Sequence, residues 1–547
     1  MDKNSVITMD CGCTFKLNTK GRIQIDDPFA LCKDCPAVWK LLGTGFTKGI
    51  FQLEKAGKQW SRRLKPESVN HIAALISIIR PGCADIKDDK GISMTEHYCR
   101  RKNNEEEVIS YDQSIDDILV PTFNTIVYQE QCMKLGQRIA GFNLVEVDML
   151  RKAIGKKDQT ELAKVRDMFL AGAKKTNIIS YDKVQEIWEW IAKSGKYSFN
   201  QAHALEYGLT AYVTAYLKAH FPVEFFNGYL DFAQDKTGPK EEIKELVEDC
   251  KIFDIEVLPP YLPKCNVDFE ADVKNSKIWF GLGNIRGIGP TQVSKLINVV
   301  KLAETNLNTQ LSQFSWMQVL IHILNMVSST VAEALISSGA LSFVKWQTRR
   351  AMLFEYKIWS DLTDLEKKWV SNNLTTNRHN LRDLLDTGAT LRKYNGAAAN
   401  VNRIKILQSL VALLDNPPTK HTDDINFIIM KEEDLFGTAL TYSRVDCKSK
   451  DEVTHTCKDI LCGFNGQATI GIEIKNTREM KIKNGKNVGQ QFCFISVSDG
   501  TCVINDVVLW PEVYVNFKNL IMNGNTVTLS GKLDKKKIFV VNGVKQL

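Results

Sequence analysis

The stretch that decides the fold opens with YSFNQAHA at residues 197–204 and closes with KAHFP at residues 218–222. Asn200 suits the N-cap of a helix from His203 to His220, because its side-chain oxygen can accept a backbone N–H of the first turn. Such a helix start presents N–H groups and the positive end of the helix dipole to an anion, and His203 would lie in that first turn. The stretch therefore predicts one long helix that begins at an anion-binding position.

Outward from this stretch, the pattern of apolar residues changes once. Helical periodicity dominates from about residue 60 to 415, and strict alternation typical of strands follows after about residue 466. Prolines at 259, 260 and 263, the sequence NPPT at 416–419 and a polar stretch at 443–456 interrupt the pattern. We expect a multidomain protein that is mainly α, with a C-terminal β-barrel.

Composition limits the class of protein. The 547 residues are 44% hydrophobic and 25% charged, which is enough for several buried cores. A net charge of +7 permits a nucleic-acid partner without demanding one. There is no run of 18 apolar residues, and the start does not have the pattern of a signal peptide. We therefore expect no membrane partner and a cytoplasmic protein.

Cysteines suggest one metal site. Cys11 and Cys13 form one close pair, and Cys32 and Cys35 form another 18 residues later. In a reducing compartment, two such pairs can close a tetrahedral thiolate site around a structural Zn²⁺ in a zinc-ribbon-like segment. The alternative is a set of ordinary reduced thiols, since the first pair departs from the commoner CxxC spacing.

Four short motifs then occur in a fixed order. They read YQEQ at 128–131, DMLRKAIGKK at 148–157, YSFNQAHA at 197–204 and KAHFP at 218–222. In order and spacing they resemble the fingers of C-family replicative DNA polymerases, the DNA polymerase III alpha subunits, whose usual forms are YQEQ, LRRAMGKK, GFNKSHA and LKAHYP. Matching segments upstream are GIFQLE at 49–54, LKP at 64–66 and RPG at 80–82. The resemblance covers about residues 40–345.

The resemblance implies a binding site for the incoming deoxynucleoside triphosphate. A triphosphate needs fixed positive charge and oriented N–H donors on rigid elements. The residues expected to supply them are Arg151, Lys152, Lys156, Lys157, Asn200 and His203. The alternative is a set of solvated basic residues beside a capped surface helix.

Two departures from the family pattern bear on this site. Lys152 stands where the family has a second arginine, which keeps the charge but loses the bidentate fork. Gln201 and Ala202 replace a lysine and a serine of the family motif. We expect the phosphates to bind more weakly, or to be shared differently among the remaining residues, but we do not expect binding to be lost.

A glycine hairpin predicts contact with duplex DNA. FGLGNIRGIGP at 280–290 precedes a helical run and resembles the FGLGAIKGVG segment of the family. In helix-hairpin-helix modules such glycines let backbone amides approach a phosphate without reading bases. The residues assigned to DNA are Arg80, in the RPG segment, and Arg286, Gly287 and Gly289. A second, degenerate hairpin is expected at 329–341, and the alternative is a purely structural turn.

The C-terminal segment predicts an OB-fold. Ile470, Ile472 and Ile474 share one face of a strand, an Asn484-Gly485 turn follows, and a helix from Pro511 precedes two more strands. Three strands, a helix and two strands is the order of an OB-fold, which binds single strands through aromatic and basic side chains. The alternative is a barrel used for packing or partner contact.

The segment EEDLFG at 432–437 resembles the peptide by which such polymerases bind the sliding clamp, but it lacks the leading glutamine. We favour the alternative, an ordinary contact at a helix end. Clamp binding remains the minority hypothesis.

The family's catalytic centre is not recognisable in this sequence. Its palm holds two Mg²⁺ between three aspartates, two of them closely spaced, and follows a metallophosphoesterase-like domain. No Asp-x-Asp pair precedes Gly49, and Asp10 lacks the helix that follows the third aspartate in the family. We expect part of a split, phage-type DNA polymerase that is inactive alone and binds a separate palm-containing chain. The alternative is a non-catalytic DNA-binding accessory protein.

Five segments follow from these assignments. They are a zinc-ribbon-like segment at 1–40, polymerase fingers with a palm edge at 41–258, a helix-hairpin-helix domain at 259–345, a helical linker at 346–455 and an OB-fold at 456–547.

Overall fold

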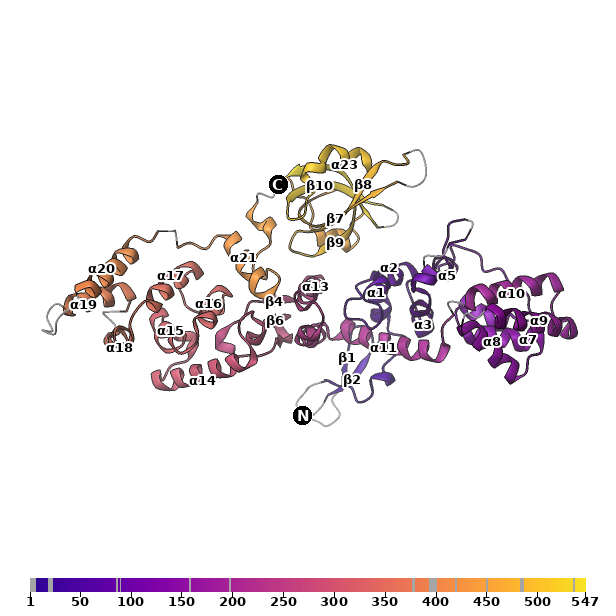
Figure 1. Ribbon diagram of the computed structural model, residues 1–547, viewed down its shortest axis with the longest axis horizontal. Coiled ribbons are helices and arrows are strands. Elements are labelled where there is room, and N and C mark those ends of the chain that lie inside the picture. The colour runs from indigo at the N-terminus through magenta and orange to yellow at the C-terminus, as the bar shows by residue number, and fades with distance from the viewer. Residues whose placement is uncertain are drawn as a thin grey trace. The chain divides into compact units, whose positions relative to one another are not determined.

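The computed structural model divides into two compact units, Met1–Phe225 and Phe226–Leu547. It describes residues 6–17, 23–84, 87–88, 90–156, 159–195, 198–375, 379–392, 401–418, 421–448, 451–482, 487–534 and 537–547. The described chain is mainly helical and ends in a closed five-stranded barrel, which confirms the predicted class in its coarse form (Figure 1). Within these ranges, no helix combines the length and apolar character needed to cross a bilayer.

The first unit begins with a small antiparallel sheet. Its strands lie in the order β1 (Val6–Thr8), β2 (Thr14–Leu17) and β3 (Ile23–Gln24). Thr8 pairs with Thr14, so residues 9–13 form a turn between the first two strands. We call β1, this turn and β2 the N-terminal hairpin. A 3₁₀ turn (Pro28–Ala30) and helix α1 (Pro36–Thr44) follow.

The long helix of this unit is α11 (Gln201–His220), close to the predicted span. Asn200 is its N-cap, as predicted, and its Oδ1 accepts the backbone N–H of His203 at 2.9 Å. Helix α11 packs against α1 and α3 (Val69–Ile78) (Figure 1). A Cβ on Gly208 would lie 3.2 Å from the carbonyl oxygen of Val69, so glycine permits this close approach.

A buried lysine fixes α11 to the segment that carries GIFQLE. The Lys218 side chain is fully buried, and its Nζ donates to the carbonyl oxygens of Phe46 at 3.1 Å and Lys48 at 2.7 Å. Nearby, Thr214 Oγ1 accepts the backbone N–H of Phe51 at 3.1 Å. The lysine of the KAHFP motif therefore has a structural role in this fold.

Four consecutive helices, α7 to α10, pack around one apolar core, with Leu135, Leu150, Phe169 and Ile187 fully buried within it. Their bounds are α7 (Gln129–Ala140), α8 (Leu144–Lys156), α9 (Gln159–Thr176) and α10 (Tyr181–Gly195). The other helices of the unit are α2 (Ala56–Leu64), α4 (Pro81–Ala84), α5 (Met94–Lys102), α6 (Asp116–Leu119) and a 3₁₀ turn (Val120–Thr122).

A short backbone bridge joins the starts of α7 and α11. The N–H of Gln129 donates to the carbonyl oxygen of Phe199 at 2.9 Å, and the N–H of Phe199 donates to that of Val127 at 3.1 Å. The YQEQ and FNQAH motifs, about 70 residues apart in sequence, are therefore side by side in the fold.

Helix α12 (Pro222–Asp231) contains the division between the units, and the second unit continues with a small sheet in the order β4-β6-β5. The strands are β4 (Glu256–Leu258), β5 (Glu270–Asp272) and β6 (Lys277–Trp279). The helices are α13 (Pro239–Ile252), α14 (Pro290–Leu307), α15 (Trp316–His322), α16 (Ser329–Ser337), α17 (Arg349–Ser360), α18 (Asp364–Asn373), α19 (Leu381–Arg392), α20 (Val401–Asp415), α21 (Ile425–Phe436) and α22 (Cys457–Leu461). Short 3₁₀ turns span Phe232–Asp235, Leu262–Lys264, Val273–Asn275, Leu282–Asn284, Leu311–Gln313, Leu324–Met326 and Arg444–Cys447.

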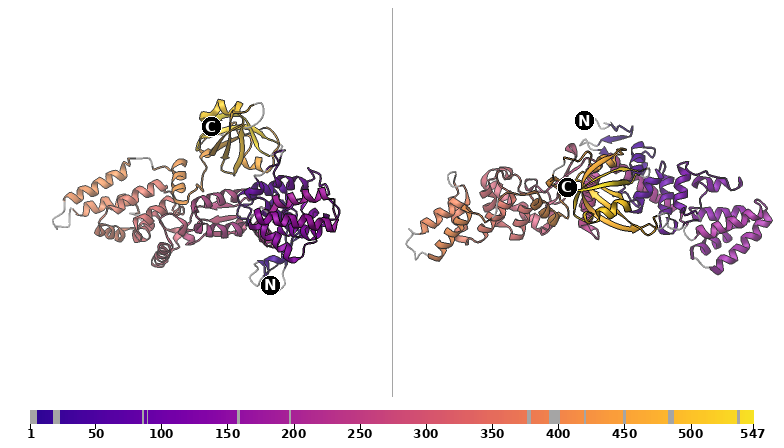
Figure 2. Two further views of the ribbon diagram at one scale, coloured as in Figure 1. Left: turned by 45° about the vertical axis from the view of Figure 1, so that its right-hand side comes forward. Right: turned by 90° about the horizontal axis from the view of Figure 1, so that it is seen from above.

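The chain ends in a barrel (Figure 2). Its strands close in the order β10-β11-β9-β8-β7. The elements are β7 (Ala468–Lys481), β8 (Gln491–Ser498), β9 (Val503–Leu509), α23 (Pro511–Phe517), a 3₁₀ turn (Lys518–Leu520), β10 (Thr526–Leu533) and β11 (Phe539–Gln546). Ile470, Ile472 and Ile474 share its core, as their alternation predicted. The predicted order of three strands, a helix and two strands is confirmed, while the Asn484-Gly485 turn lies outside the described residues.

Candidate functional site

The N-terminal end of α11 is the first candidate site, and a carboxylate of the protein already offsets part of its positive charge. Glu130, in the first turn of α7, accepts hydrogen bonds from Asn200 Nδ2 and from the backbone N–H of Gln201, each at 2.9 Å. Together with the bond from His203 to Asn200, two first-turn N–H groups therefore have protein partners. The cap is the one that the sequence predicted, Glu130 is an additional partner, and anion binding at this helix start stays a prediction.

Several side chains with planar groups contact one another beside this helix start. The Arg80 guanidinium lies 4.6 Å from the ring centroid of Phe199, which is typical of a cation–π contact. The ring centroids of Phe199 and His203 are 5.5 Å apart, and those of His203 and Tyr207 are 3.9 Å apart. Arg80 and His203 are both exposed. We call Arg80, Phe199, Asn200 and His203 the helix-start site.

The basic residues of α8 lie apart from this site. Arg151 and Lys152 are both exposed and form ion pairs with Asp148, at 2.8 and 2.7 Å. Hydrogen bonds from Lys152 and Arg151 lower the pKa of the Asp148 carboxyl. In the described part of the chain, no hydrogen bond, ion pair or ring contact joins either cation to Asn200 or His203. The side chain of Lys156 and all of Lys157 lie outside the described residues.

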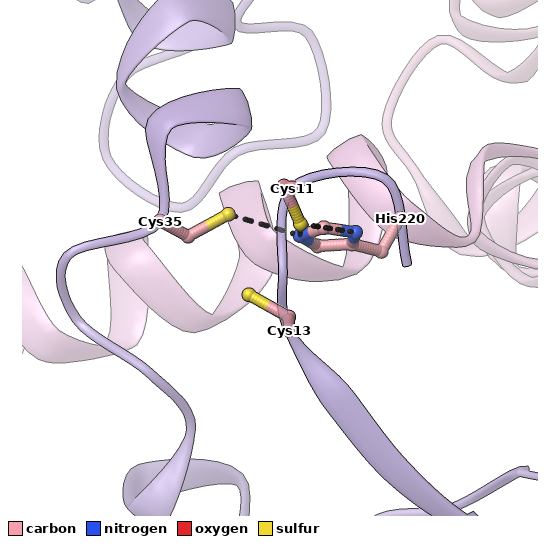
Figure 3. A group of neighbouring side chains, drawn as sticks. All are labelled: Cys11, Cys13, Cys35 and His220. Carbon is pink, nitrogen blue, oxygen red and sulfur yellow. Dashed lines mark hydrogen bonds between the residues drawn. The ribbon is translucent and has the colours of Figure 1, made fainter. Parts of the chain in front are cut away.

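The second candidate site is at the other end of α11. Cys11 and Cys13, in the turn of the N-terminal hairpin, face Cys35 and His220, and their four ligand atoms all lie within 4.8 Å of one another (Figure 3). Cys35 Sγ is 3.2 Å and Cys11 Sγ is 3.6 Å from His220 Nε2. We call these four residues the thiol cluster. Three of the four predicted cysteines come together, and a histidine stands in the fourth place.

Cys32 lies outside the thiol cluster. Its side chain is exposed, while its carbonyl oxygen accepts a hydrogen bond from the Tyr212 hydroxyl at 2.7 Å. The backbone of Cys32 is thus held against α11, with the thiol at the surface. It lines the same cavity as the other three thiols, so it is close to the cluster without belonging to it.

Burial raises the pKa of the Cys13 thiol to about 12 and also raises that of Cys35. At Cys11, burial is outweighed by hydrogen bonds from Cys13 and Cys35, which lower the pKa of the thiol. Burial lowers the pKa of the His220 imidazole. Soft thiolates with one imidazole suit Zn²⁺, whose charge favours the deprotonated thiols, so the residues present fit that ion.

Three of the four residues assigned to DNA, namely Arg286, Gly287 and Gly289, are on a glycine turn before α14, whereas Arg80 lies beside Phe199. Gly287 has φ +90°, a left-handed conformation that favours glycine, and Gly289 is the N-cap of α14. Arg286 forms an exposed ion pair with Asp434 at 2.6 Å. An exposed pair of this kind contributes little energy to the fold. Helix α16 ends at Ser337, before Gly339, while the second hairpin expected at 329–341 stays a prediction.

The clamp-like segment is the end of a packed helix. Leu435 and Phe436 are buried at the end of α21, and the Phe436 ring lies 4.5 Å from that of Phe280. Gly437 caps the helix in the left-handed conformation. These contacts are those expected of an ordinary helix end, and clamp binding through this segment would require it to unpack.

The barrel carries aromatic side chains outside its core. Cys493, Ile495 and Val497 of β8 point into the core, so Phe492 and Phe494 take the opposite face. Phe492 stacks on Trp510 with ring centroids 5.2 Å apart, and Arg478 lies 5.9 Å from the Phe494 ring. Flat rings beside a cation are the side chains with which OB-folds stack bases.

Comparison with known proteins agrees with these motifs. A model of the bacterial DNA polymerase III alpha subunit finger domain matches residues 12–177. DNA polymerase III subunit alpha of Aquifex aeolicus is 37% identical over 516 residues, or 92% of this chain and 38% of the relative. This chain is related to the C-family polymerase alpha subunits. The predicted family is therefore confirmed.

Other alpha subunits match over a shorter span. That of Helicobacter pylori (strain ATCC 700392 / 26695) is 34% identical over 291 residues, or 51% of this chain and 23% of the relative. That of Mycobacterium leprae is 34% identical over 317 residues, or 56% of this chain and 25% of the relative. The chain thus spans about two fifths of the length of the Aquifex relative and about a quarter of the others.

Sequence reasoning missed three residues at these two sites. Glu130 and Phe199 stand inside the quoted motifs, but only the fold shows that one caps α11 and the other contacts Arg80. His220 also stands in a quoted motif. Its 185-residue separation from Cys35 hid it from a search for closely spaced ligand pairs.

Proposed function

We propose that this chain supplies nucleotide and DNA binding to a replicative DNA polymerase, while a separate palm-containing chain supplies the catalytic aspartates. In this arrangement the first unit acts as fingers that hold the incoming deoxynucleoside triphosphate. The glycine turn before α14 binds the primer–template duplex, and the barrel binds the single-stranded template. The relatedness to polymerase alpha subunits supports the general role in DNA replication.

The observation that carries this proposal is the helix-start site. Arg80 presents a guanidinium and His203 an imidazole at the start of one rigid helix, beside the ring of Phe199. A triphosphate brings negative charge that fixed cations and helix N-termini stabilise, and a base offers a flat face for stacking. In the proposed complex the phosphates contact Arg80 and His203, so Arg80 joins the nucleotide site rather than serving duplex DNA alone.

The basic end of α8 acts from a distance in this proposal. Among the residues that the structure describes, Arg151 and Lys152 are exposed and pair with Asp148 of their own helix, so their charges can exchange Asp148 for phosphate oxygens at small cost. In this proposal, the two residues attract the triphosphate electrostatically and do not contact it directly, unless the bound state brings α8 and α11 together.

Catalysis needs groups of another kind. In-line attack on a nucleotide uses two Mg²⁺ held by carboxylates. In the described ranges, the one group of three or more metal-ligating side chains is the thiol cluster, which contains no carboxylate. We therefore assign the Mg²⁺-binding aspartates to the proposed palm chain and a structural Zn²⁺ to this one.

Primer extension with defined mixtures tests the proposal. We expect no incorporation by this chain alone, and incorporation when a palm-containing chain of a related alpha subunit is added. Arg80→Ala and His203→Ala should each lower kcat/KM for the nucleotide by about 100-fold, the effect of removing one preorganised donor. His379→Ala, at an exposed histidine of the second unit, is the matched control and should change nothing.

Two outcomes would overturn the arrangement. Extension by this chain alone, in a preparation free of other polymerases, would place the aspartates within it. Tight DNA binding without extension in the presence of any palm chain would favour the accessory protein.

A further inference from the structure

We propose that the thiol cluster binds one Zn²⁺ through Cys11, Cys13, Cys35 and His220, with Cys32 excluded, and that the ion ties the N-terminal hairpin to the end of α11. This inference concerns metal binding alone and does not depend on the polymerase assignment. It replaces the four-cysteine site that the sequence predicted with a Cys₃His site.

The distances between ligand atoms suit a tetrahedral ion. Zn–S bonds of about 2.3 Å and Zn–N bonds of about 2.0 Å place neighbouring ligand atoms roughly 3.5–3.8 Å apart. Cys11 Sγ is 3.6 Å and Cys35 Sγ is 3.2 Å from His220 Nε2, and no two of the four ligand atoms are more than 4.8 Å apart. Small side-chain adjustments would therefore complete the tetrahedron. Nε2 is nearer to Cys11 than Nδ1 is, which makes Nε2 the ligand nitrogen.

Three independent elements position the ligands (Figure 3). In the N-terminal hairpin, the N–H of Met9 donates to the carbonyl oxygen of Cys13, and Gly12 adopts φ +84° between the two thiols. Cys35 is the N-cap of α1, and His220 is the last residue of α11. A turn with positive φ between two ligands lets both thiols face one point, as in a metal knuckle.

Packing holds these elements together around the cluster. The Phe15 ring lies 6.0 Å from that of Tyr216 and 5.2 Å from that of Phe221, so the hairpin is seated on the end of α11. The centroid of the Tyr216 ring also lies 4.4 Å from that of the His220 imidazole, and this contact limits rotation of the imidazole. The site is preformed on packed side chains, so an ion needs little rearrangement to bind.

The surroundings indicate a structural ion. Cys13 and Cys35 are buried, while Cys11 and His220 are half-buried. Four protein ligands leave no open position for water, which is the arrangement of structural zinc sites and not of catalytic ones. Cys32 is the alternative fourth ligand, but its thiol is exposed and its backbone is fixed to Tyr212.

Metal content of single variants separates the two ligand sets. We would purify the full chain and its variants without chelator, measure bound zinc by elemental analysis and measure affinity by competition with a chromophoric chelator. The wild type and Cys32→Ser should each hold about one zinc with equal affinity, whereas His220→Ala should bind on the order of 100-fold more weakly or not at all.

The variant His220→Cys tests whether a loss of zinc in His220→Ala results from a failure to fold. It offers four thiolates at the same place, so zinc content should return to about one equivalent. With Co²⁺ as the probe, the thiolate charge-transfer band should keep its intensity in Cys32→Ser and gain intensity in His220→Cys.

Three results would overturn the proposal. They are loss of zinc from Cys32→Ser, unchanged zinc affinity in His220→Ala, and a wild-type chain with less than about a tenth of an equivalent of zinc.

Discussion

The two ends of α11 perform different tasks with the same helix. At its start, Asn200 and His203 are exposed and meet a carboxylate, Glu130, and a guanidinium, that of Arg80. At its end, His220 is half-buried and meets three thiols. The exposed end keeps its groups available to a ligand that comes and goes, whereas the partly buried end can keep an ion for the life of the fold. In the two proposals, the residues that bind the nucleotide and the histidine that binds the metal ion are thus about 17 positions apart on one helix.

The largest expected effect is at the buried end. A bound ion stabilises the folded state by about 4 kcal/mol when its free concentration is 1,000 times its dissociation constant. Removal of zinc with a chelator should therefore lower the unfolding temperature of the first unit and open the N-terminal hairpin to protease. Thermal unfolding and limited proteolysis, each with and without chelator, measure this.

Cys35→Ser is the matched control for that experiment, because it removes a ligand. It should unfold at the lower temperature and no longer respond to chelator. An equal chelator effect on this variant and on the wild type would show that the ion binds elsewhere.

The sequence predicted the exposed end better than the buried one, for a physical reason. A helix start is specified locally, so Asn200 and the three residues after it were enough to predict the cap. The thiol cluster depends on a long-range contact, and the sequence gives no hint that His220 meets Cys35. The spacing of cysteines therefore suggested Cys32, which the fold turns outward.

The same contrast holds elsewhere in the chain. The barrel was predictable because alternation in Ile470, Ile472 and Ile474 and the order of elements are local signals. The sequence predicted the charges of the residues on one helix, but it did not predict which groups those residues pair with. Arg151 and Lys152 pair with Asp148 of their own helix, and nothing in the motif specified whether α8 approaches α11.

Lys218, near the same end of α11, should be nearly as sensitive as the thiol cluster. Lys218→Met removes a buried ammonium that donates to two backbone carbonyl oxygens. A hydrogen bond to a charged group contributes about 1.5–3 kcal/mol, so we expect a loss of roughly 2–5 kcal/mol in the free energy of unfolding. Chemical denaturation measures it.

Lys175→Met, at an exposed position of α9, is the control and should change stability by less than about 0.5 kcal/mol. Equal stability of the two variants would mean that Lys218 is not buried as described.

A smaller effect is expected at the exposed end. Asn200→Ala removes the cap of α11 and the bond to Glu130, which should cost about 1–2 kcal/mol. For a unit of this size, each kcal/mol lowers the unfolding midpoint by about 2–4 °C. Asn200→Asp keeps the capping oxygen but places a second carboxylate beside Glu130. It should therefore recover only part of the loss, and full recovery would show that the contact with Glu130 contributes nothing.

The smallest effect on stability is expected from Arg151→Ala. The pair with Asp148 joins two half-exposed groups within one helix turn, and such pairs contribute little to stability, less at high salt. Thermal unfolding should therefore show almost no change. Primer extension with a palm chain should still show weaker use of the nucleotide, and this loss should shrink as salt rises, because a charge that acts without a defined contact is screened within about 10 Å at 0.1 M ionic strength. His203→Ala, in contrast, should lose activity by a similar factor at every salt concentration, since it acts through direct contact. A loss in Arg151→Ala that is independent of salt would mean that α8 reaches the triphosphate directly, and the distinction drawn here between the helix-start site and the basic end of α8 would then fail.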